Sequence, residues 1–194
     1  VLGKGKNVYE ANITLFDAFK KSNFDKNGKF GFERYFAAHS IMMSFEGIPA
    51  IYFNSIFGNS NDNSKYIISG NKRDLNRYRW NSLKLEYHLK DKNSKQTKYY
   101  VNMINLLKIR NKQKAFHPNA KRITLDLGSK FFAFNRTSLD RKQTITCITN
   151  MTSTIQLLNV NNKVMYGKNL INKKLVKINK KLQLEPFQTV WILN

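Results

Sequence analysis

Apolar residues follow a helical period in several stretches of the first 116 residues. Between Phe32 and Phe45 they form a wide apolar face, which predicts a helix largely buried between a sheet and its neighbours. The pattern over Tyr99–Lys114, with Pro118 just past its end, predicts the most regular helix of the chain. We expect a shorter helix at Leu83–Leu89. The stretch Gly58–Ser69, rich in Asn, Ser and Gly, is expected to be a loop.

A continuous apolar run, Ile48–Phe53, differs from these helical stretches. Gly47 precedes it, and Gly58 follows shortly after its end. Because its apolar residues do not alternate with polar ones, the run predicts a parallel strand that is buried on both faces. The charged segment Lys72–Arg77 comes next. Since α/β enzymes build their sites where such strands end, we expect a site at the C-terminal end of this strand.

After Pro118 the apolar period changes to two, which is typical of short antiparallel strands joined by turns. The predicted fold class is therefore α/β plus all-β, dividing near Phe116 into domains 1–116 and 117–194. The alternating positions are Ile123, Leu125, Leu127, Phe132, Phe134, Ile145 and Cys147, with further strands expected at Leu175–Ile178, Leu182–Leu184 and Thr189–Leu193.

The chain of 194 residues carries a net charge of +22, which suits either a nucleic-acid-binding surface or an anionic substrate. The charge comes from 26 Lys and only 8 Arg, and the lysines are dispersed beside 25 Asn. This pattern favours compositional bias over a nucleic-acid footprint. The single cysteine, Cys147, excludes internal disulfides and fits a reducing cytoplasm. No apolar run is long enough to span a bilayer. The start at Val1, inside a Gly/Lys segment, suggests a fragment.

Candidate binding residues are few, because His, Asp and Glu are scarce. The cluster Arg73, Asp74, Asn76 and Arg77 combines groups that hydrogen-bond sugar hydroxyls or phosphate. A solvated loop with internal ion pairs is the alternative interpretation. The aromatic–acidic pair at residues 9–10 is a weaker candidate. The three histidines are scattered, which argues against a metal site, and His39 is expected to be a core residue.

Five segments have the order and spacing of one enzyme family: Tyr9–Asp17, Ala37–Met43, Gly47–Gly58, Arg73–Arg77 and Ala115–Asn119. With them, nearly the whole chain resembles the C-terminal part of the sucrose-phosphorylase-like subgroup of the α-amylase superfamily, glycoside hydrolase family 13. The resemblance implies the C-terminal part of a (β/α)8 barrel followed by a small antiparallel β-sandwich domain. In it, Phe32–Phe45 is the seventh outer helix, Ile48–Phe53 the eighth strand and Tyr99–Lys114 the last helix.

The resemblance also implies an activity, which is transfer of glucose with retained configuration from an α-glucoside to inorganic phosphate, giving glucose 1-phosphate. The Asp nucleophile, the Glu acid/base and the third carboxylate are expected upstream of Val1, so no catalytic residue is assigned. Arg73 corresponds to the arginine that holds the transferred glucose, with Asn76 and Arg77 in the same motif. Tyr9 and Glu10 match the loop on the acceptor and phosphate side. Sucrose-cleaving members carry Tyr-Gln there, so a glucosylglycerol or glucosylglycerate donor competes with sucrose.

Two other functions remain open. One is hydrolysis or transglucosylation within the same superfamily. The other is a basic nucleic-acid-binding module, which predicts lysines clustered on one face and salt-sensitive DNA binding. The favoured interpretation takes a sugar and inorganic phosphate as partners, with no nucleic acid, membrane, metal or cofactor. The sequence leaves the oligomeric state open.

Overall fold

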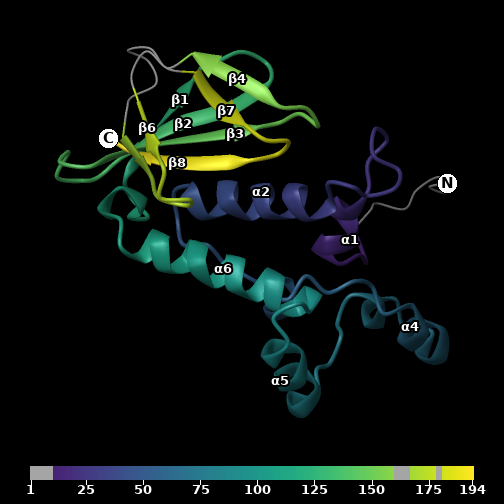
Figure 1. Cartoon of the computed structure of the whole chain (residues 1–194). Coiled ribbons are helices and arrows are strands. Elements are labelled where there is room, and N and C mark those ends of the chain that lie inside the picture. Colours follow the sequence, from purple (N-terminus) through teal and green to yellow (C-terminus); the bar gives the residue numbers. More distant parts are fainter. Residues whose placement is uncertain (1–10, 160–166, 178–180) are drawn as a thin grey trace, which may run out of the picture.

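The computed structural model describes residues 11–159, 167–177 and 181–194 (Figure 1). Among them no helix is both long and apolar enough to cross a membrane. The helices are α1 (Leu15–Lys20), α2 (Gly31–Ser44), α3 (Phe53–Ile56), α4 (Asn63–Ser69), α5 (Ser82–Lys90) and α6 (Lys95–Asn111), with 3-10 turns η1 (Lys72–Leu75) and η2 (Lys114–Phe116).

The helices predicted from periodicity are confirmed as α2, α5 and α6. Helix α6 begins four residues before the prediction, because the Ser94 side chain accepts a hydrogen bond from the Thr97 amide at 3.0 Å and caps the helix. The expected loop over residues 58–69 is wrong in its second half. There Asp62 caps α4 through the Lys65 amide at 2.9 Å, and Gly70 ends the helix at φ +65°.

The prediction of a buried parallel strand at residues 48–53 is wrong for this chain. The backbone there is extended at Tyr52, but no strand pairs with this segment among the described residues, and α3 already begins at Phe53. Its side chains are not buried either: Ile48 is 84% exposed, Tyr52 54% and Phe53 53%. A strand needs a neighbour to receive its backbone hydrogen bonds, and the described residues supply none. The barrel is therefore not closed in this chain.

The antiparallel pattern predicted after Pro118 is confirmed for the described residues, and Ile178 lies outside them. Strands β1, β2, β3, β8, β5 and β6 lie in this order in one antiparallel sheet, and β4 pairs with β7 in a second. The strands are β1 (Lys121–Leu125), β2 (Phe131–Thr137), β3 (Thr144–Asn150), β4 (Gln156–Asn159), β5 (Gly167–Asn169), β6 (Leu175–Val176), β7 (Lys181–Leu184) and β8 (Thr189–Leu193).

The six-stranded sheet lies between helices on one face and the β4–β7 ribbon on the other (Figure 1). Alternation along the strands divides the side chains between the two faces. Cys147 and Trp191 pack with Met43 of α2 and Met103 of α6 in the larger core. Their neighbours on the strands, such as Ile148, fill the smaller core under the ribbon. The larger core thus crosses residue 116. The division into domains 1–116 and 117–194 remains a prediction.

The C-terminal end of α2 is buried, and each of its last four carbonyls has a partner, as a buried helix end requires. Two of these carbonyls are bonded locally, by the Ser44 hydroxyl and the Phe45 amide. The other two accept hydrogen bonds from arginines: Arg110 donates to Met43 O and Arg136 to Ser44 O. Arg110 also donates to Gly47 O at 3.0 Å. The two guanidinium groups also complement the negative end of the helix dipole.

Candidate functional site

The arginine motif lies on η1, after helix α4. The Asn71 side chain opens this turn by accepting a hydrogen bond from the Arg73 amide at 3.0 Å. Arg73 and Arg77 line one pocket of about 430 Å³. The structure thus brings together two of the predicted binding residues. The described residues that line it are Tyr52, Lys65, Asn71, Arg73, Asp74, Arg77, Tyr78 and Arg79.

Asp74, the one carboxylate among the described residues that line this pocket, is held by its neighbours. One of its oxygens lies 2.8 Å from Lys65 Nζ. Hydrogen bonds from Lys65 and Ser69 lower the pKa of the Asp74 carboxyl, and the charges of Lys65 and Arg79 lower it further. Asp74 is therefore ionised at neutral pH and paired, so it serves to hold the loop. The ion pair joins the motif to Lys65 of α4.

Asn76, the third predicted binding residue, lies in a neighbouring pocket of about 340 Å³. Tyr52 lines both pockets. The side-chain oxygens of Asn54, Asn59 and Asn76, which line this second pocket, are buried and have no hydrogen-bond partner among the described residues. Such oxygens ordinarily have a partner, so this pocket is a place where further donors fit. Tyr9 and Glu10 lie outside the described residues.

Asn54 links Tyr52 to Tyr78 in the candidate site, and sequence reasoning missed it. Its Nδ2 donates to the Tyr52 hydroxyl at 3.2 Å and to the Tyr78 carbonyl at 2.8 Å. Asn54 is 4% exposed, so these bonds are shielded from water. The available signal was a polar amide directly after an apolar run. The other missed residues, Tyr78 and Arg79, directly follow Arg77 in an Arg–aromatic run.

His39 is a buried structural residue, as predicted. It is 2% exposed, and its Nδ1 lies 2.9 Å from the Tyr35 carbonyl oxygen. Burial lowers the pKa of His39, so the ring is neutral at pH 7. The described residues contain no group of three or more His, Cys, Asp or Glu side chains that could hold a metal ion.

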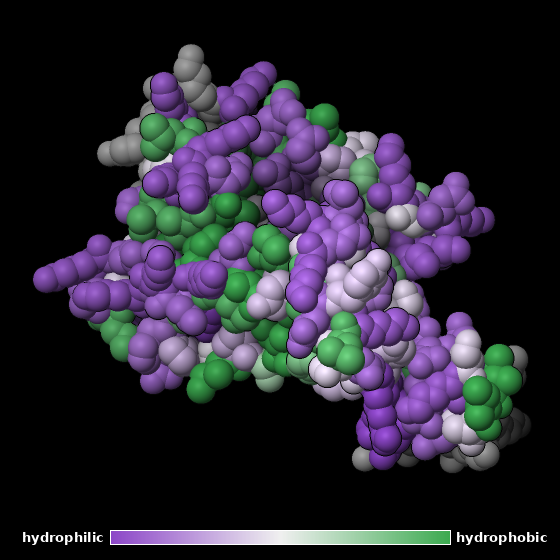
Figure 2. Space-filling model, turned by 60° about the horizontal axis from the view of Figure 1, so that its bottom comes forward, coloured by the Kyte–Doolittle hydropathy of each residue, from purple (hydrophilic) through white to green (hydrophobic). Residues whose placement is uncertain are grey.

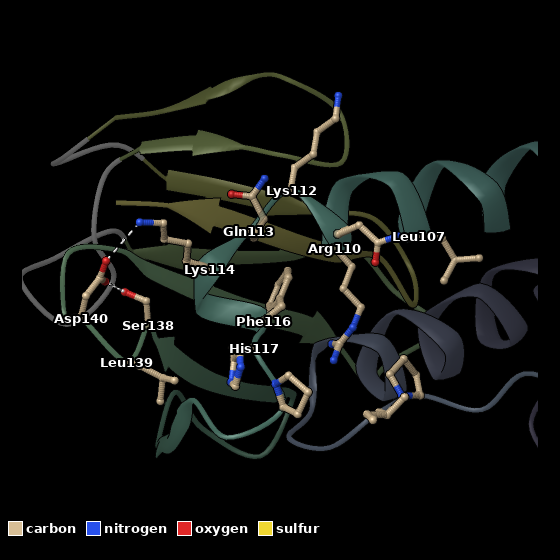
Figure 3. A pocket seen from close by; sticks show the side chains of 14 residues that line it. Leu107, Arg110, Lys112, Gln113, Lys114, Phe116, His117, Ser138, Leu139 and Asp140 are labelled. Atoms are coloured by element: carbon tan, nitrogen blue, oxygen red, sulfur yellow. Dashed lines mark hydrogen bonds and ion pairs between the residues drawn. The ribbon is translucent and has the colours of Figure 1, made fainter.

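A larger pocket, of about 640 Å³, lies at the other end of the extended segment, beside Ile48 (Figure 3). None of the predicted binding residues that the structure describes lines it. Asp140 in its wall accepts hydrogen bonds from Ser138 at 2.6 Å and from Lys114 at 3.2 Å. Arg110 is bonded to backbone carbonyls. The motif-bearing pockets are the better candidate site, because the predicted residues Arg73, Asn76 and Arg77 line them.

In sequence the chain is similar to known phosphorylases, and in fold it is similar to solved structures that include AmyP and an alpha-amylase. No family model matches the chain. Over 186 residues it is 33% identical to the glucosylglycerate phosphorylase of Allomeiothermus silvanus, covering 96% of this chain and 31% of the relative. The Escherichia coli glucosylglycerate phosphorylase is 29% identical over 96% of the chain and 32% of its own length. A sucrose phosphorylase of Agrobacterium vitis is 26% identical over 66% of the chain and 23% of the relative.

The chain therefore spans about a third of the length of the two glucosylglycerate phosphorylases, at 31% and 32%. Among solved structures, AmyP in complex with maltose aligns with a TM-score of 0.67 and 15% identity, over 84% of this chain and 34% of AmyP. An Anoxybacillus alpha-amylase aligns with a TM-score of 0.61 and 15% identity, over 90% of this chain and 36% of the amylase. These likenesses concern the fold. The sequence matches add the family: the chain is a distant homologue of the glucosylglycerate and sucrose phosphorylases of glycoside hydrolase family 13.

Proposed function

We propose that this chain is the C-terminal, sugar-binding part of a retaining glucoside phosphorylase. The enzyme transfers glucose from an α-glucoside to inorganic phosphate and releases glucose 1-phosphate. The observation that carries the proposal is the similarity to glucosylglycerate phosphorylases across 96% of the chain. It is supported by the shared pocket of Arg73 and Arg77 at the C-terminal end of the extended segment. A glucosylglycerate-type donor is the first candidate substrate, with sucrose and glucosylglycerol as alternatives.

We also propose that residues 1–116 form the last units of a (β/α)8 barrel. The support comes from the segment 48–53, which has the composition of a buried strand and an extended backbone but leaves Ile48 84% and Tyr52 54% exposed. Hydrophobic surface also runs between hydrophilic patches on the face shown in Figure 2. Parallel strands of a barrel would cover the side chains of Ile48 and Tyr52 and would receive the backbone hydrogen bonds of segment 48–53. In this arrangement Arg73 faces a sugar at the C-terminal rim.

A chimera tests both proposals. The matching 31% of the Allomeiothermus silvanus glucosylglycerate phosphorylase is replaced by this chain. Release of glucose 1-phosphate from glucosylglycerate is then measured with and without phosphate. We expect phosphate-dependent release, and its loss in a chimera carrying Arg73→Gln, because Gln lacks the charged fork of Arg. An Arg141→Gln chimera is the matched control. It removes the same charge from the turn between β2 and β3 and should keep full activity.

Two results would contradict the proposal. Release of glycerate that is equally fast without phosphate, with no glucose 1-phosphate formed, indicates hydrolysis or transglucosylation instead. A folded chimera with unchanged activity after Arg73→Gln removes Arg73 from the sugar site. Hydrogen exchange gives a reading independent of activity. Amides 50–52 should exchange rapidly in the 194-residue chain and become protected in the chimera, where strands flank them.

A further inference from the structure

The pocket of Arg73 and Arg77 carries more positive charge than a neutral sugar requires. Its described lining holds four cationic side chains, Lys65, Arg73, Arg77 and Arg79, and a single carboxylate, Asp74. Lys65 and Asp74 form an ion pair with 2.8 Å between their charged atoms, and they are half-buried, with side-chain exposures of 31% and 21%. Because this pair neutralises itself, the guanidinium charges of Arg77 and Arg79 add a net positive charge to the described lining.

The neutral groups of the pocket add hydrogen-bond donors beside these arginines. The Tyr52 hydroxyl accepts a hydrogen bond from Asn54 Nδ2 at 3.2 Å. A hydroxyl that accepts in this way still has its own proton to donate. Asn71 uses its side-chain oxygen to accept from the Arg73 amide, which leaves its Nδ2 group as a further donor. The wall is therefore rich in donors and positive charge, which is the chemistry that binds an oxyanion.

We propose that this pocket binds an oxyanion, either a phosphate or a carboxylate, with Arg77 and Arg79 as its principal ligands. Guanidinium groups bind both kinds of anion through paired hydrogen bonds. The choice of probes rests on the proposed function, since a phosphorylase uses phosphate and glucosylglycerate carries a carboxylate. The site then discriminates substrates by charge, favouring an anionic group over a neutral polyol.

Isothermal titration of the 194-residue chain at low ionic strength tests this proposal. The probes are inorganic phosphate, glycerate and the neutral polyol glycerol. We expect about millimolar binding of phosphate, glycerate or both, and no binding of glycerol at the same concentrations. Raising the salt concentration to physiological strength should weaken the binding, because exposed charges are screened over about 8 Å. Binding of one anion only identifies which group the pocket takes.

Single substitutions locate the binding on the molecule. Arg77→Gln and Arg79→Gln should each weaken anion binding about tenfold, the worth of one charge-assisted hydrogen bond. The control Arg141→Gln removes the same charge from the turn between β2 and β3 and should leave binding unchanged. Both tested arginines are exposed, so the variants should fold, and circular dichroism checks this. Arg79→Lys should recover only part of the affinity, because an ammonium lacks the paired donors.

Three outcomes overturn the proposal: neither anion binds, glycerol binds as well as the anions, or all three Arg→Gln variants weaken binding equally. The last result means that the net charge attracts anions without a site. Failure of the proposed function has a different signature. The pocket is supported and the phosphorylase proposal contradicted if two results occur together. The chain binds an anion and loses that binding in Arg79→Gln, while the chimera releases no glucose 1-phosphate. If the chimera releases glucose 1-phosphate but the titration finds no anion binding at the arginines, only the proposal of an oxyanion pocket is contradicted.

Discussion

Arg136 should be among the side chains that contribute most to the stability of this protein. It is 0% exposed, and no carboxylate is hydrogen-bonded to it among the described residues. Its guanidinium donates to three carbonyl oxygens, at 2.5 Å to Ser44, 2.8 Å to His117 and 3.2 Å to Ala120. It thereby ties the end of α2 to the turn before β1 and to β2. We predict that Arg136→Met, which keeps much of the length and apolar volume, strongly destabilises the fold.

The magnitude follows from the partners that are lost. Hydrogen bonds to a charged group contribute about 1.5–3 kcal/mol each, so three contribute roughly 5–9 kcal/mol. Removing the buried charge returns several kcal/mol of desolvation free energy. Burial lowers the pKa of Arg136, in agreement with this cost. We therefore expect a net loss of about 3–5 kcal/mol, a large share of the roughly 5–15 kcal/mol that stabilises a typical domain.

Urea denaturation followed by circular dichroism measures this loss. The matched control is Arg122→Met, because Arg122 forms a partly exposed ion pair with Glu46 at 2.9 Å. That pair should contribute about 1 kcal/mol or less. The m-value should stay constant in both variants if the change lies in stability alone. The reasoning is refuted if Arg136→Met lowers the free energy of unfolding by no more than Arg122→Met does.

Three further predictions concern other parts of the fold. Gly58→Ala should destabilise by about 1–3 kcal/mol in urea denaturation, because Gly58 has φ +60° and an added Cβ would lie 2.4 Å from Tyr99 Cδ1; an unchanged midpoint would contradict this. Met103→Ala, in the larger core at 1% exposure, should cost about 2–5 kcal/mol in the same assay, and a loss below about 1 kcal/mol would show that the site collapses. Asp25 should govern part of the acid stability: the Phe30 amide is the main cause that lowers its pKa from 3.8 to about 2. The stability from Asp25 is therefore complete above pH 3.8 and lost as the pH falls towards 2. Asp25→Asn should flatten stability against pH in that window, and an unchanged slope would contradict the assignment.

Elements with local signals could be predicted from the order of the amino acids. The helical spacing of Phe32–Phe45 and Tyr99–Lys114 predicted α2 and α6, because a helix closes its hydrogen bonds within its own segment. Alternation at residues such as Phe134 and Cys147 predicted the antiparallel strands, since one face of each strand must be buried. The residue types of Arg73–Arg77 likewise predicted a polar loop with charged donors, because each side chain carries its own hydrogen-bonding groups. The resemblance to family 13 rested on the order of such segments.

Features that depend on distant partners required the folded chain. Ile48–Phe53 has the composition of a strand, yet it forms no ladder among the described residues, because a strand exists only where neighbours take its hydrogen bonds. The role of Arg136 required knowing that Ser44, 92 residues away in sequence, ends a helix against it. Lys65 of α4 and Arg79 line the same pocket as the motif, which only the folded structure shows. Periodicity reports the face that a segment buries, while pairing, charge balance and pocket shape depend on what the fold places opposite that face.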